Sequence, residues 1–208
     1  MSSFFQTNTI PSRHAESTTG LELFFDLVYV AILVELGNRL SHDLTLGGVG
    51  QFLFLFIIVW WSWLEKVLFA RFFPNDDIGQ RLLTFVYMAI MGMMAFNIHD
   101  VTGSQAANFL LAYGASKVVL ALMYFKAGRQ HPQYRTMTRV YMVTFIIAAL
   151  AWFAIAIFAP NNMWQWAVVS GFGILFAALS PLLHKRFETF SFEIPPMKKH
   201  YMRHRFGE

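Results

Sequence analysis

The fold is decided by the stretch QFLFLFIIVWWSWLEKVLFA, which runs from Gln51 to Ala70. It is almost entirely apolar, and its only charged side chains are those of Glu65 and Lys66. A helix of about 20 mostly apolar residues is long enough to cross the hydrocarbon core of a bilayer, because each residue adds about 1.5 Å. The stretch therefore predicts a membrane-spanning helix, with two charges inside it.

The composition of the whole chain leads to the same conclusion. Of its 208 residues, 56% are hydrophobic and only 13% are charged, whereas soluble domains average about 25% charged residues. A soluble protein of this size could not bury so much apolar surface, which excludes a soluble enzyme and a disordered chain. It also excludes a nucleic-acid partner, despite a pI near 9.5. The chain has no cysteine, so it has neither a disulfide nor a thiolate metal site.

Five more apolar runs accompany the first and complete an all-α fold, a polytopic integral membrane helix bundle in the cell membrane. The six predicted spans are Leu21–Leu40, Gln51–Ala70, Arg81–Ile98, Ala106–Lys126, Thr138–Ala159 and Met163–His184. Residues 21–184 thus form the bundle. Residues 1–20 are a polar tail without the apolar core of a signal peptide, and residues 185–208 are a basic tail.

The positive charges indicate the orientation of the bundle. Lys and Arg gather in the two tails and in the second and fourth connections, whereas Arg39 stands alone on the opposite side. Cytoplasmic loops carry the excess of positive charge, so both termini are predicted to be cytoplasmic.

Apart from the basic residues close to their ends, the predicted spans contain six charged side chains, and a charged group inside a membrane costs about 2.5–3.5 kcal/mol on insertion scales. They are Glu22, Asp26 and Glu35 on the first span, Glu65 and Lys66 on the second, and Lys117 on the fourth. Such groups need a partner or water. They are the candidate binding residues of the protein.

The heights of these charges along their helices suggest partners. Asp26 and Lys66 are both near the inner ends of consecutive spans, which favours an ion pair between them. Lys117 lies near the middle of its span, from where it could reach Asp26 or Glu35. Glu35 also has Arg39 four residues later, a favourable helical spacing.

Two interpretations of these charges stay open. In the first, they form a polar site in which Asp26 and Glu22 bind a small cation or a proton, with Lys66 or Lys117 as the counter-charge. In the second, they neutralise one another and hold the bundle together.

Other polar residues have a functional and a structural interpretation. The pairs His42–Asp43 and His99–Asp100 could form a metal or proton site, or they could be polar helix ends, which is the interpretation we prefer. Asp76 and Asp77 precede the third span and are expected to cap it. The tryptophans Trp60, Trp61 and Trp63 lie too deep for an interfacial belt and are expected to pack in the core or to line a pocket. The sequence predicts no cofactor and contains no motif of a soluble enzyme.

Three stretches resemble one family. The first is LELFFDLVYV, residues 21–30, which looks like the opening motif of the low temperature requirement A (LtrA) family. The second runs from WWSW, residues 60–63, through Asp76-Asp77 and Arg81 to Met88, and it is similar to that family's Trp-rich second helix and Asp-Asp loop. The third is HYMRHRFGE, residues 200–208. The positions that match the family motifs are Glu22, Phe25, Asp26, Asp76, Asp77 and Arg81.

The resemblance implies a multi-pass membrane protein that is usually longer than this chain, so residues 185–208 would lead into a further helix. The family name refers to growth at low temperature, which suggests stress adaptation without specifying a chemistry. We expect a bundle that moves or senses a small ion or solute. The alternatives are a membrane scaffold or stress-related accessory protein that binds lipid or a partner protein, and a membrane enzyme acting on lipid. The expected partners are the bilayer and a small ion or proton, and a homo-oligomer is compatible with the sequence.

Overall fold

The computed structural model describes residues 20–74 and 77–187, with side chains described up to residue 175. The described residues form six long helices and two short 3₁₀ helices, and they contain no β-strand. The elements are α1 (Gly20–His42), α2 (Leu46–Phe72), α3 (Ile78–Asn97), η1 (Ile98–Asp100), α4 (Ala106–Gln130), η2 (Pro132–Tyr134), α5 (Arg135–Phe158) and α6 (Met163–Phe187). The all-α fold predicted from the sequence is confirmed, and each predicted span corresponds to one long helix.

Four helical segments are long and apolar enough to cross a membrane, by length and composition. They are Leu46–Phe72, Ile78–Asp100, Ala106–Gln130 and Pro132–Phe158. The helix α1 has the necessary length, but its charged side chains set it apart from these four. The described side chains of α6 form a shorter apolar segment, Met163–Leu175. The protein is therefore a helical membrane bundle.

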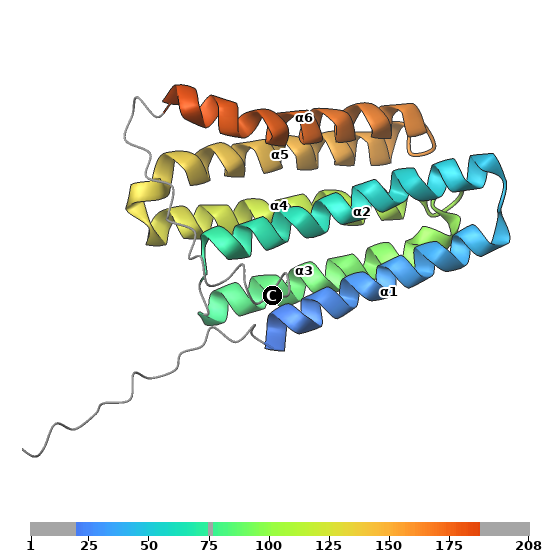
Figure 1. Cartoon of the computed structure of the whole chain (residues 1–208), viewed down its shortest axis with the longest axis horizontal. Helices are drawn as coiled ribbons and strands as arrows, with labels where there is room; N and C mark the ends of the chain where they lie inside the picture. Colours follow the sequence, from blue (N-terminus) through green and yellow to red (C-terminus); the bar gives the residue numbers. More distant parts are fainter. Residues whose placement is uncertain (1–19, 75–76, 188–208) are drawn as a thin grey trace, which may run out of the picture.

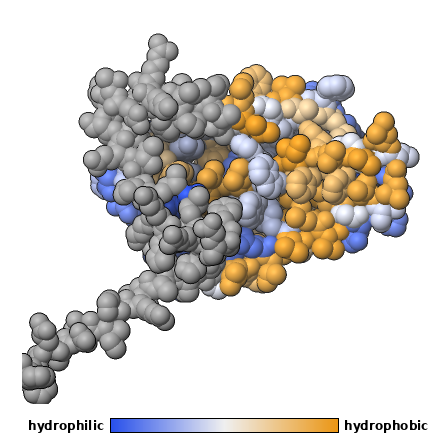
Figure 2. Space-filling model, viewed as in Figure 1, coloured by the Kyte–Doolittle hydropathy of each residue, from blue (hydrophilic) through white to orange (hydrophobic). Residues whose placement is uncertain are grey.

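The six helices lie lengthwise beside one another, with α5 and α6 on one side of the bundle and α1 and α3 on the other (Figure 1). Large apolar side chains such as Leu27, Ile147 and Leu150 are exposed on the outside of the helices. Much of the described surface in Figure 2 is correspondingly hydrophobic. Such a surface is suited to contact with lipid tails and would be a liability in water.

The helix α4 lies at the centre, packed most extensively against α5 and then α3. Two glycines make the close approach of α5 feasible. A Cβ atom on Gly114 would lie 2.6 Å from a ring carbon of Phe153, and one on Gly128 would collide with the Thr138 side chain. Small residues let membrane helices approach closely and gain packing contacts. The Tyr113 and Trp152 rings meet edge to face between these helices, with centroids 4.8 Å apart.

Four side chains of the apolar core lie on α1, α2 and α3 in the half of the bundle that leads toward the α1–α2 connection. We call Ile32, Leu36, Leu55 and Met94 the apolar plug. Each is almost completely shielded from solvent. The four side chains belong to the same buried cluster as the rest of the core.

Capping side chains explain why several helices begin earlier than predicted. The backbone N–H of Gly48 donates to the Thr45 hydroxyl at 3.1 Å, so α2 begins at Leu46 instead of Gln51. The N–H of Gln80 donates to the Asp77 carboxylate at 2.7 Å, so α3 begins at Ile78. The predicted capping role of Asp77 is confirmed, whereas Asp76 lies outside the described residues.

Asp77 also ties the start of α3 to the end of α4. Its carboxylate forms an ion pair with Lys126 and accepts a hydrogen bond from the Gln130 amide at 2.8 Å. The Lys126 ammonium, with help from Gln130 and the Gln80 N–H, holds the pKa of the Asp77 carboxyl well below its usual range. A carboxyl with a lowered pKa in the folded state stabilises the fold when it is ionised.

We expect the contribution of Asp77 to stability to be complete near neutral pH and to fade as the pH falls below about 4, the ordinary pKa of an unfolded aspartate. The substitution Asp77→Asn would keep the helix cap but lose the charge. The melting temperature of the purified wild type should therefore exceed that of the variant at pH 7, and the difference should shrink toward pH 3. A difference that stays constant with pH would mean that the carboxylate charge has no role.

Candidate functional site: a polar layer inside the bundle

Four side chains of one segment of α2 connect it to its three neighbours in the bundle. Ser62, Trp63, Glu65 and Lys66 lie within little more than one helical turn, and successive residues point about 100° apart. They therefore face α1, α3 and α4 at similar heights. With their partners they form what we call the polar layer: Glu22, Asp26, Tyr29, Ser62, Trp63, Glu65, Lys66, Tyr87 and Lys117.

Hydroxyl groups from three helices meet at Ser62. The Tyr29 hydroxyl and the Ser62 Oγ are 2.6 Å apart. Ser62 also donates to the Val59 carbonyl at 2.9 Å, so the proton between the two hydroxyls is best assigned to Tyr29. The Tyr87 hydroxyl donates to the Ser62 carbonyl, also at 2.9 Å. All these side chains are buried, so their hydrogen bonds fix α1, α2 and α3 relative to one another.

Asp26 accepts a hydrogen bond from the Trp63 indole N–H at 2.9 Å. The ion pair predicted from the sequence between Asp26 and Lys66 is wrong. The Lys66 ammonium lies instead against two aromatic rings, 5.6 Å from the centroid of Phe25 and 5.8 Å from that of Phe69. The prediction failed because equal height along two helices does not make their side chains point at each other.

Lys66 is only 6% exposed. Within the described part of the chain, the ammonium group has no directly bonded carboxylate, and Glu22 is the acidic side chain that acts on its charge. The aromatic faces supply a weaker cation–π attraction. Lys66 is thus a buried cation near Glu22, with no direct ion pair among the described residues.

Glu65 and Lys117 form an ion pair between α2 and α4. Their side chains are 14% and 3% exposed, respectively. The Lys117 ammonium also lies 4.3 Å from the centroid of the Tyr113 ring. The predicted reach of Lys117 to Asp26 or Glu35 is therefore wrong, because Glu65 faces it directly from the neighbouring helix. Both members of this pair were predicted as site residues, whereas their pairing was not.

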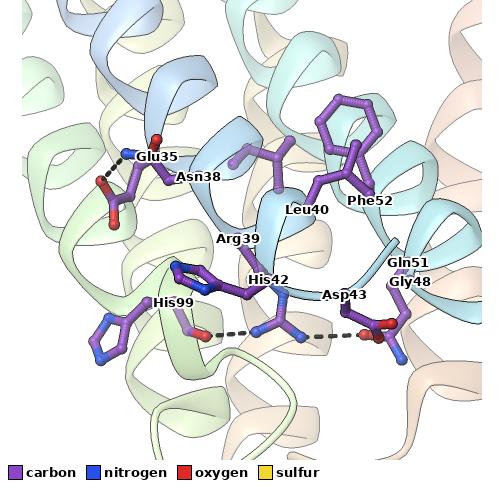
Figure 3. A pocket seen from close by; sticks show the side chains of 11 residues that line it. Glu35, Asn38, Arg39, Leu40, His42, Asp43, Gly48, Gln51, Phe52 and His99 are labelled. Atoms are coloured by element: carbon purple, nitrogen blue, oxygen red, sulfur yellow. Dashed lines mark hydrogen bonds between the residues drawn. The ribbon is translucent and has the colours of Figure 1, made fainter. Parts of the chain in front are cut away.

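Glu35 lies away from the polar layer, toward the α1–α2 connection. Its carboxylate has a long contact of 3.5 Å with the Asn38 amide. The predicted pairing with Arg39 is also wrong. Arg39 donates to the His99 carbonyl, to the Gln51 side chain at 3.1 Å and to the Thr102 hydroxyl at 3.0 Å. The 3₁₀ helix η1 supplies the His99 carbonyl, and α2 supplies the Gln51 side chain (Figure 3).

The histidine–aspartate pairs at this end behave as polar helix ends. Asp43 accepts hydrogen bonds from Thr45, and Asp100 accepts from Ser104 at 2.7 Å. Among the residues whose positions are described, no group of three or more His, Cys, Asp or Glu side chains could hold a metal ion.

Two further residues at the family-motif positions of the sequence, Phe25 and Arg81, lie outside the polar layer. Phe25 is buried and packs against the rings of Tyr29 and Tyr87, with centroids 5.2 Å and 5.9 Å away. Arg81 is exposed on the first turn of α3. Ser62 and Tyr87 were not among the residues predicted from the sequence. Ser62 could have been identified from the sequence, because it is a polar residue between tryptophans inside an apolar helix.

The sequence model of the bacterial low temperature requirement A protein (LtrA) matches residues 17–208. The chain belongs to the LtrA family. This match covers the whole polar layer. Together with the four apolar helices of spanning length, membership of the LtrA family identifies a membrane protein.

An uncharacterised protein of Rhizobium meliloti (strain 1021), RA0937, is 31% identical to this LtrA-family chain over 110 residues. The aligned part is 51% of this chain and 27% of the relative, so the match spans about a quarter of that longer protein. No solved structure matches the chain.

Proposed function

We propose that this LtrA-family protein binds a small cation or a proton in its polar layer and moves or senses it in the cell membrane, which the chain crosses several times. The observation that carries the proposal is the group formed by Glu22, Asp26 and Lys66. It supplies two carboxylates and one buried ammonium on adjacent helices, without a direct ion pair between Asp26 and Lys66. Ionisable groups at membrane depth are expensive, and they commonly mark ion and proton pathways.

The balance of charge favours a cation over an anion. When all groups are ionised, the polar layer contains three carboxylates, those of Glu22, Asp26 and Glu65, and two ammonium groups, those of Lys66 and Lys117. Acidic groups therefore outnumber basic groups among these five side chains, which suits a cation better than an anion. Glu65 and Lys117 pair with each other, so the carboxylates proposed to bind the cation are those of Glu22 and Asp26.

The surrounding groups have distinct roles in this proposal. The Trp63 N–H donates a hydrogen bond to Asp26 and orients its carboxylate. The hydroxyls of Tyr29 and Ser62 offer further oxygens one turn deeper in the bundle. Beyond them the apolar plug closes the bundle, so an ion can cross only if α1 and α2 separate around Ile32 and Leu55.

Ion binding should raise the stability of the purified protein. A ligand at about 100 times its Kd adds about 2.7 kcal/mol to the folded state, which corresponds to about 5–10 °C in Tm for a chain of this size. We expect one of Li⁺, Na⁺ and K⁺, or acidification, to raise the Tm of the wild type. Asp26→Asn should abolish that response.

Asp100→Asn is the matched control, because it makes the same acid-to-amide change at the opposite end of the bundle. It should keep the ion response of the wild type. If the wild type and Asp26→Asn respond equally to every ion, the polar layer does not bind the ion through Asp26.

A scaffold function is the second candidate. It is favoured by the bonds that use the buried charges structurally, namely the Glu65–Lys117 pair and the Trp63–Asp26 hydrogen bond. A scaffold that binds lipid or a partner protein would show no ion response, and Asp26→Asn would mainly lower the folding yield.

A further inference from the structure

A pocket of about 460 Å³ lies where the ends of α1, α2 and η1 meet (Figure 3). Its polar wall includes Glu35, Arg39, His42 and His99, and Phe52 is among its apolar lining residues. The apolar plug lies between this pocket and the polar layer. The pocket is therefore separate from the proposed ion site, and its occupant has to be inferred from its own side chains.

Three charged side chains line the pocket. Asp43 is exposed and accepts hydrogen bonds from Thr45, whereas the other two are half-buried, opposite in sign and not paired with each other. Glu35 and Arg39 lie one turn apart on α1, yet no ion pair joins either of them to a charged residue in the described parts of the chain. Arg39 is bound by neutral oxygens of His99, Gln51 and Thr102, which draw it away from Glu35. Glu35 has only the long contact with the Asn38 amide.

This arrangement discriminates between ligands by charge. A simple cation would be attracted by Glu35 and Asp43 but repelled by Arg39, and a simple anion would meet the reverse. A molecule with an ammonium group and an acidic group satisfies both side chains at once. We propose that the pocket binds a small zwitterion, with its ammonium at Glu35 and its acidic group at Arg39.

Other lining residues fit this ligand. The His99 Nδ1 contacts the Phe96 carbonyl at 2.9 Å, so its Nε2 is the ring nitrogen left for a ligand. His42 is exposed beside it. Leu36, Leu40 and Phe52 provide an apolar surface for a short carbon chain. The volume falls within the range of about 300–1,000 Å³ that is usual for small-molecule sites.

Titration calorimetry with the purified protein tests the proposal. Two of the probes are zwitterions, phosphoethanolamine and alanine. The other two carry charge of one sign: ethanolamine is a cation and inorganic phosphate is an anion. At least one zwitterion should bind at least about ten times more tightly than ethanolamine and than phosphate, because it makes two charge-assisted contacts instead of one. Glu35→Gln should remove that advantage, and Asp100→Asn should keep it.

A second measurement distinguishes a free zwitterion from a lipid headgroup. The protein is placed in nanodiscs of phosphatidylglycerol with or without phosphatidylethanolamine, and the retained lipids are identified by native mass spectrometry. Retention of phosphatidylethanolamine that phosphoethanolamine displaces would assign the pocket to a lipid headgroup. Binding of a soluble zwitterion without lipid retention would assign it to a free solute.

The proposal fails if neither zwitterion binds and no phosphatidylethanolamine is retained. It also fails if ethanolamine or phosphate alone binds as tightly as the zwitterions, or if folded Glu35→Gln binds them as the wild type does. Circular dichroism and gel filtration confirm that the variant is folded. None of these results depends on ion binding in the polar layer, so the two proposals can fail independently.

Discussion

Lys117→Met should destabilise the bundle by about 3–5 kcal/mol, because removing one partner of a buried ion pair leaves the other charge buried and uncompensated. Lys117 is almost fully buried and pairs with Glu65 between α2 and α4. Methionine has a similar length and fills the space of the lysine side chain. The loss should therefore reflect the stranded Glu65 carboxylate and not a cavity.

The double variant Glu65→Leu/Lys117→Met tests this explanation. It removes both charges, so it should regain most of the lost stability, since apolar replacements of buried pairs are often neutral or stabilising. The free energies of unfolding can be compared by titration with a denaturing detergent. Equal losses in the single and double variants would show that Lys117 contributes through packing alone.

Lys126→Met is the matched control for Lys117→Met. It makes the same substitution on the same helix, but near the end of α4. Lys126 pairs with Asp77 at the end of α4, and both side chains there are partly exposed. Water solvates a stranded carboxylate at such a position, and surface pairs contribute little. Its effect should be much smaller than that of Lys117→Met.

The helices of this protein could be predicted from the sequence because the relevant signal is local. Long apolar runs specify spanning helices by their length and hydropathy alone. The ends were less accurate where a capping side chain decided them, as Thr45 does for α2. The orientation of the bundle in the membrane stays a prediction from the distribution of Lys and Arg.

The composition of the polar layer could be predicted in part. Five of the six predicted binding residues lie in it, because a charge inside a span is visible in the sequence. Glu35 does not, since it lies on the far side of the apolar plug. Tyr29 shares a face with the acidic residues of its helix, whereas Ser62 and Tyr87 were missed because neutral hydroxyl groups are common in membrane helices.

The partners of the charges could not be predicted. Sequence position gives the height of a side chain along its helix, but the direction it faces depends on how the helices are rotated and packed. Lys117 therefore meets Glu65 instead of Asp26. Arg39 bonds to His99 in η1 and to Thr102 just after it instead of to Glu35, because η1 brings a carbonyl within its reach.

Asp26→Asn should abolish ion movement while leaving the bundle folded. Asparagine has nearly the same shape as aspartate, and its amide oxygen can still accept the Trp63 hydrogen bond. It cannot bind a proton in exchange for a cation, and it removes one negative charge from the polar layer. The substitution thus separates the proposed function of Asp26 from its structural contact.

The most direct test is ion flux into liposomes that contain the purified protein, with wild type, Asp26→Asn and Asp100→Asn measured side by side. We predict saturable flux of a small cation or protons with the wild type and with Asp100→Asn, and a loss of at least about tenfold in folded Asp26→Asn. Flux that is equal in Asp26→Asn and the wild type, or no flux above protein-free liposomes from any variant, would contradict the proposal that the polar layer is an ion pathway.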